Sequence, residues 1–156
     1  MDEIGWRKAA RFGWTTLAML PYRAALFPPL RAAWVRVLGA RIGPRSVLHA
    51  VRFFNLYRRG LSGLDLGNEC FLGDECLLDL AEGITLGRQV TLPERVVVLT
   101  HLNVAYADHP LQAHFPAQAA PVVVELDPAG GDLGSRWHIH DQPGLAGLVL
   151  GAPRRD

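Results

Sequence analysis

The sequence predicts a mainly β fold in which short strands stack as a narrow solenoid, and two observations indicate it. First, an aliphatic side chain returns every six residues in the middle of the chain, and the same period resumes after a shift of two residues. These side chains are Leu66, Leu72, Leu78, Ile84, Leu86, Leu92 and Val98. Second, glycine directly follows three of them, at Gly67, Gly73 and Gly87. A six-residue period fits neither a helix nor an alternating strand, but it fits a chain that turns a corner every few residues.

The positions four residues after Leu66, Leu72, Leu86 and Leu92 carry small or β-branched side chains. They are Cys70, Cys76, Val90 and Val96. Such side chains suit a crowded inner corner, and glycine at a turn can adopt a positive φ that a Cβ would oppose. A buried antiparallel sheet with chance spacing is the alternative, but it does not explain why glycine recurs in one register. Cys70 and Cys76 are expected to be small buried residues, with a nucleophile or a disulfide as open alternatives.

The hexads resemble those of the hexapeptide-repeat acyltransferases, the family that includes the maltose and galactoside O-acetyltransferases. Residues 97–103, 108–112 and 120–125 are similar to that family's strand ending in a histidine, its outward loop and its returning strand. The resemblance covers about residues 38–125. It implies a left-handed parallel β-helix, acetyl-CoA as acyl donor without a metal, and a homotrimer.

Three segments are expected along the chain. They are an N-terminal helical segment at 1–39, a hexapeptide-repeat β-helix at 40–125 with an outward loop at about 101–120, and a divergent, irregular tail at 126–156. The first segment predicts helices at about 4–20, stopped by Pro21, and at about 29–38. Its apolar runs are too short to span a bilayer, and Asp2 and Glu3 argue against a signal peptide. The helices fit a cap over the open end of the solenoid, with attachment to a membrane surface as an addition.

The composition fits one domain with a core, because 49% of the 156 residues are apolar. With 16 basic and 15 acidic residues, the chain lacks the strongly basic balance typical of nucleic-acid binding. The basic residues concentrate in the first sixty positions, so the N-terminal part is cationic. The two cysteines are compatible with a reducing compartment. We expect a cytoplasmic location, with the inner face of the membrane as a site of contact.

Transfer of an acyl group to a sugar hydroxyl needs a base, and imidazole suits that task. The resemblance implies that the base is the histidine just beyond a strand, which is His101 here. His109 in the outward loop is the competitor, and a structural role for both stays open. By register, Asp79 is the nearest group to hold the second nitrogen of the base. Asp74, Asp79, Asn103 and His109 are the candidate residues on the acceptor side, although either aspartate could simply fill a turn.

After Glu125 the six-residue period disappears. In the resembling family the later coils carry most coenzyme A contacts, so the donor site stays unassigned. This tail fits a natural cap, a truncated domain or a shifted reading frame. His138 and His140 are spaced as a metal pair but lack further ligands, so no metal is predicted.

The predicted function is that of an O-acyltransferase, which moves acetyl from acetyl-CoA to a sugar hydroxyl in polysaccharide or glycan modification. Two alternatives stay open. One is a non-catalytic remnant that has lost the coils binding coenzyme A, and the other is a membrane-surface or sugar-binding module.

Overall fold

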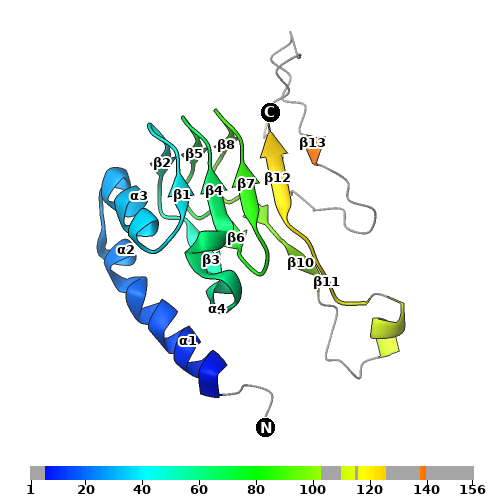
Figure 1. Ribbon diagram of the computed structural model, residues 1–156. Helices are drawn as coiled ribbons and strands as arrows, with labels where there is room; N and C mark the ends of the chain where they lie inside the picture. Colours follow the sequence, from blue (N-terminus) through cyan, green and yellow to red (C-terminus); the bar gives the residue numbers. More distant parts are fainter. Residues whose placement is uncertain (1–5, 103–109, 115, 126–137, 140–156) are drawn as a thin grey trace.

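The computed structural model describes residues 6–102, 110–114, 116–125 and 138–139 (Figure 1). Its N-terminal part is helical, with α1 (Trp6–Ala18), α2 (Leu20–Ala24) and α3 (Pro28–Val37). The first helix ends at Ala18, two residues before its predicted end, and Pro21 lies in the first turn of α2, where its missing N–H costs no hydrogen bond. No described helix is long and apolar enough to cross a membrane.

The strands that follow form three parallel sheets. The first holds β1 (Arg41–Ile42), β4 (Leu64–Leu66), β7 (Ile84–Leu86) and β12 (Val122–Glu125), with β13 (His138–Ile139) antiparallel at its end. The second holds β2 (Val47–Leu48), β5 (Phe71–Leu72) and β8 (Thr91–Leu92), and the third holds β3 (Arg52–Phe54), β6 (Leu77–Asp79) and β9 (Val97–Val98). From β1 to β9 the chain visits the three sheets in turn, so neighbours within a sheet are three strands apart in sequence.

Shorter elements interrupt or leave these sheets. A turn of helix, α4 (Leu56–Arg59), and the 3-10 helix η1 (Gly60–Gly63) connect β3 to β4. Beyond β9, β10 (His101–Leu102) and β11 (Gln118–Ala119) pair antiparallel and lead away from the sheets, with the 3-10 helix η2 (Pro110–Ala113) between them in sequence (Figure 1).

The predicted fold class, a left-handed parallel β-helix solenoid, is wrong. The described strands form separate small sheets, and the described part of the chain shows no closed or solenoid sheet. Each strand is only two to four residues long, because residues between strands leave the β region. The residues Arg45, Glu69, Glu75, Gln89 and Arg95 have φ between 59° and 64°. The irregular tail predicted from residue 126 on lies outside the described residues except for β13.

The predicted burial of the periodic aliphatics is confirmed. All of them, Leu66, Leu72, Leu78, Ile84, Leu86, Leu92 and Val98, are at most 3% exposed. Cys70 and Cys76 are also buried, and each Sγ lies 3.0 Å from a backbone carbonyl oxygen, that of Gly87 and that of Pro93. Burial raises the pKa of both thiols, which favours a packing role over a nucleophilic one.

The glycines serve a different purpose from the one predicted. The positive φ expected at glycines such as Gly67 and Gly73 is taken instead by the non-glycine residues between strands. A Cβ on Gly67 would lie 2.7 Å from the backbone of Gly87, and one on Gly73 would lie 2.7 Å from the backbone N of Glu94. Glycine is therefore required because neighbouring backbones approach too closely for any side chain.

This close approach makes Gly67→Ala a strongly destabilising change. The added methyl meets backbone atoms that cannot rotate away, so we expect a loss of about 1–3 kcal/mol in the free energy of unfolding. Urea denaturation followed by circular dichroism measures it. Gly83→Ala is the matched control, because its Cβ would find its nearest neighbour at 3.6 Å, an ordinary contact. Equal losses in the two variants would show that backbone contact is not the cause.

Candidate active site

His101 and Asp79 meet where the chain leaves the third sheet. Asp79 is the last residue of β6, and His101 opens β10, three residues after the end of β9. The Nδ1 atom of His101 is hydrogen-bonded to Oδ2 of Asp79. The Asp79 side chain is fully buried, whereas that of His101 is 27% exposed. The pair therefore joins a buried carboxylate to an imidazole that solvent or a ligand can reach.

Several donors surround the Asp79 carboxylate. Its Oδ1 accepts hydrogen bonds from the side-chain amide of Asn55 at 2.7 Å and from the backbone N–H of Ala81 at 3.0 Å. Its Oδ2 accepts one from the backbone N–H of Thr100 at 3.1 Å. The Thr100 hydroxyl lies 2.9 Å from the main-chain oxygen of Asp79 and accepts a hydrogen bond from the Glu82 N–H. The carboxylate is thus held rigidly as well as buried.

The charge of Asp79 depends on two opposing effects. Burial is the largest and would raise the pKa of the carboxyl, because it removes water from the charged form. Hydrogen bonds from Asn55, His101 and the backbone of Ala81 and Thr100 lower it, and together they hold the pKa of Asp79 below its ordinary value. The group is therefore an anion at neutral pH.

This geometry selects one form of the imidazole. A carboxylate only accepts hydrogen bonds, so Nδ1 of His101 must carry a proton toward Asp79. The neutral ring then has its lone pair on Nε2, and the described residues make no hydrogen bond to that atom. The ring of Phe54 lies with its centroid 6.2 Å from that of His101. An oriented imidazole with a free Nε2 can take a proton from a bound hydroxyl.

The structure does not gather all the predicted site residues. Asp74 has an exposed side chain, accepts a hydrogen bond from the Ala50 N–H at 2.9 Å and lies 3.6 Å from Nδ1 of His49. It therefore belongs to a second histidine–carboxylate contact, away from His101. Asn103 and His109 lie outside the described residues.

Sequence reasoning missed Asn55 and Thr100. Thr100 directly precedes the predicted base, and Asn55 stands 24 residues before Asp79. The same offset of 24 separates the partners in two surface contacts, Arg41 with Asp65 and Arg45 with Glu69. The contacts of Gln89 with Glu69 and of Arg95 with Glu75 have an offset of 20 instead, so the sequence spacing alone does not single out Asn55.

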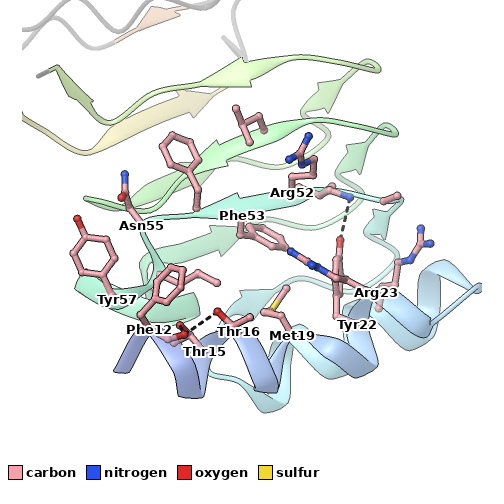
Figure 2. Close-up of a pocket in the computed structure, with 16 residues that line it drawn as sticks. Phe12, Thr15, Thr16, Met19, Tyr22, Arg23, Arg52, Phe53, Asn55 and Tyr57 are labelled. Atoms are coloured by element: carbon pink, nitrogen blue, oxygen red, sulfur yellow. Dashed lines mark hydrogen bonds between the residues drawn. The ribbon is translucent and has the colours of Figure 1, made fainter. Parts of the chain in front are cut away.

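A pocket of about 710 Å³ lies beside the site, between the inner side of α1 and α2 and the strand β3 (Figure 2). Figure 2 shows Met19 and Tyr22 on the helical side of the pocket, where the ring of Tyr22 lies edge-on against that of Phe53, with the ring centroids 5.7 Å apart. Phe54 and Asn55 both line the pocket. The ring of Phe54 also lies near that of His101, and the side chain of Asn55 also donates a hydrogen bond to Asp79. The basic residues of its lining are Arg23, Arg31 and Arg52, and none of the described residues that line it is acidic. The pocket combines apolar walls with positive charge.

Comparisons of the chain with family models, with curated proteins and with solved structures find no match. The described residues contain no group of three or more His, Cys, Asp or Glu side chains that could hold a metal ion.

The lowered pKa of Asp79 predicts how stability depends on pH. An ordinary aspartate titrates at about 3.9, so the stabilisation from Asp79 is complete above that pH and is lost as the pH falls through the lower pKa of the folded state. Asp79→Asn removes this titration and should lower the free energy of unfolding at neutral pH by about 1–3 kcal/mol. Denaturation of both proteins across the acid range should show their difference shrinking toward low pH.

Asp65→Asn is the control for this measurement. Asp65 pairs with Arg41 at the surface, where an ion pair contributes at most about 1 kcal/mol. A difference between wild type and Asp79→Asn that stayed constant from neutral to strongly acid pH would contradict the role of the buried charge.

Proposed function

We propose that the protein is an O-acyltransferase that moves an acyl group, acetyl in the simplest case, from a coenzyme A thioester to a sugar hydroxyl. The observation that carries the proposal is the pair formed by the accessible imidazole of His101 and the buried, multiply hydrogen-bonded carboxylate of Asp79. The resemblance of the hexads and of residues 97–125 to the hexapeptide-repeat acyltransferases supports the same reaction class.

In the proposed reaction Nε2 of His101 takes the proton of the acceptor hydroxyl as its oxygen attacks the thioester carbonyl. The new C–O bond forms, the C–S bond breaks, and the imidazolium returns its proton to the departing thiolate. Asp79 keeps the imidazole in the required tautomer and stabilises the positive charge that develops on it. Asn55 and Thr100 act as positioning residues, because they hold Asp79 rather than the substrate.

The pocket beside the pair is our candidate for the acceptor side of the site. It shares Phe54 and Asn55 with the surroundings of the pair, and aromatic side chains such as Tyr57 offer flat faces against which a sugar can stack. Its arginines favour an acceptor that carries negative charge. Asn103 and His109 stay candidate acceptor residues, whereas Asp74 lies in the contact with His49 away from His101. We assign no residues to the coenzyme A site.

We place the activity in the cytoplasm, where coenzyme A thioesters are available, and we propose a homotrimer as the resemblance implies. In a cyclic trimer one interface is repeated three times. A stable monomer in analytical ultracentrifugation would remove the trimer from the proposal.

His101→Ala should reduce acyl transfer by roughly 10²- to 10⁴-fold, the range expected when a general base is lost. Release of free coenzyme A from acetyl-CoA, measured with a panel of sugars and sugar phosphates, provides the assay. His49→Ala is the matched control, because His49 also contacts an aspartate but is not bonded to Asp79. It should retain nearly full activity, and His109→Ala should lose less than His101→Ala.

Full activity in His101→Ala would refute the assigned role. A wild-type chain that transfers acetyl to no acceptor and binds no coenzyme A would instead favour the alternative, a non-catalytic remnant of such an enzyme.

A further inference from the structure

Helix α1 turns its apolar face away from the rest of the protein. Trp6, Trp14 and Leu17 are spaced so that they share one side of the helix, and they are 77%, 70% and 59% exposed. The side chains of α1 that line the pocket are Phe12, Thr15 and Thr16, and the buried Met19 follows them, so both tryptophans of the helix lie on the side away from the pocket. A helix at the surface of a soluble domain normally does the reverse and buries its apolar stripe.

The exposed apolar surface continues over the other two N-terminal helices. Its further members, with their exposed fractions, are Leu20 at 52%, Leu26 at 83%, Phe27 at 67%, Leu30 at 58% and Val37 at 75%. We call α1, α2 and α3 with these side chains the helical layer, which lies along one side of the molecule in Figure 1. So large a group of exposed apolar side chains marks an interaction surface.

The charge of the helical layer indicates what kind of partner it binds. The sequence from residue 4 to residue 64 contains no Asp or Glu. Arg11 and Arg23 are exposed in the helical layer, Arg23 at the edge where it also lines the pocket, and no carboxylate among the described residues pairs with either of them. Tryptophan and leucine on one face, bordered by arginine, are typical of helices that lie in the interface of an anionic membrane.

We propose that the helical layer binds the surface of an anionic lipid bilayer, with α1 lying in the plane of the headgroups. A second copy of this chain fits the same surface poorly, because it would place one arginine-bearing face against another. Capping is compatible with the proposal, since α3 buries Ala32 and Val35 and contacts β1 and β2 while α1 keeps its apolar side outward. The proposal does not depend on the acyltransferase activity.

Binding to lipid vesicles tests the proposal with the full chain. Sedimentation with vesicles of phosphatidylcholine mixed with phosphatidylglycerol should carry the protein down, and vesicles of phosphatidylcholine alone should bind it much more weakly. Replacing both Trp14 and Leu17 by alanine should weaken binding about tenfold or more, because the removed side chains no longer enter the bilayer. Replacing Arg11 and Arg23 by glutamine should weaken binding roughly 20- to 30-fold, about fivefold for each charge.

Two variants outside the helical layer serve as controls. Leu102→Ala removes another exposed leucine, and Arg88→Gln removes another exposed arginine, so both should bind vesicles like the wild type. Circular dichroism verifies that each variant is folded. Failure of the wild type to sediment with anionic vesicles, or equal binding to both vesicle types, would overturn the proposal. A dimer that forms without lipid and is lost in the Trp14 and Leu17 variant would identify a second copy as the occupant.

Discussion

The close stacking of successive backbone segments is the constraint on which the rest of the structure depends. At Gly43, Gly67 and Gly73 the neighbouring backbone comes so near that even a methyl group would collide with it. This contact lets strands of two or three residues pair with their neighbours, although such strands are too short to be stable alone. It also buries one or two aliphatic side chains of each strand from β4 to β9, and these belong to a single core cluster that runs from Met19 to Val124.

The same stacking assembles the candidate site from residues that are distant in sequence. Asn55 lies over Asp79 because β3 pairs with β6, and Thr100 reaches Asp79 because β6 pairs with β9. Burying a carboxylate is unfavourable unless it is hydrogen-bonded. Here the donors lie on segments that the pairing of the strands already orders, so bonding Asp79 requires no further loss of chain entropy. His101 can then use Asp79 as a fixed support at the point where the chain departs toward β10.

The N-terminal helices both pack against the rest of the fold and form an exposed apolar surface. Trp34 donates a hydrogen bond to the carbonyl of Ala18 at 2.8 Å, and Tyr22 bonds both the carbonyl of His49 and the N–H of Val51. The first bond joins α3 to α1, and the two bonds of Tyr22 attach the helical layer to the segment between β2 and β3, with Met19 and Tyr22 buried at the junction. The apolar side chains of α1 therefore stay exposed to a partner. The pocket lies on the other side of α1, between this helix and the candidate base.

The sequence by itself determined the local features of this protein. The six-residue period located the buried aliphatics, and the resemblance to the hexapeptide-repeat acyltransferases pointed to His101 as the base, with Asp79 as the nearest supporting group by register. The solenoid predicted from this period was wrong, because a period specifies which side chains are buried and not how separate sheets join. Only the tertiary structure showed that glycine is required where two backbones touch and that Asn55 and Thr100 bond Asp79. It also showed that the apolar face of α1 is exposed. Each of these depends on which distant segment lies alongside, and that contact is not encoded in local spacing.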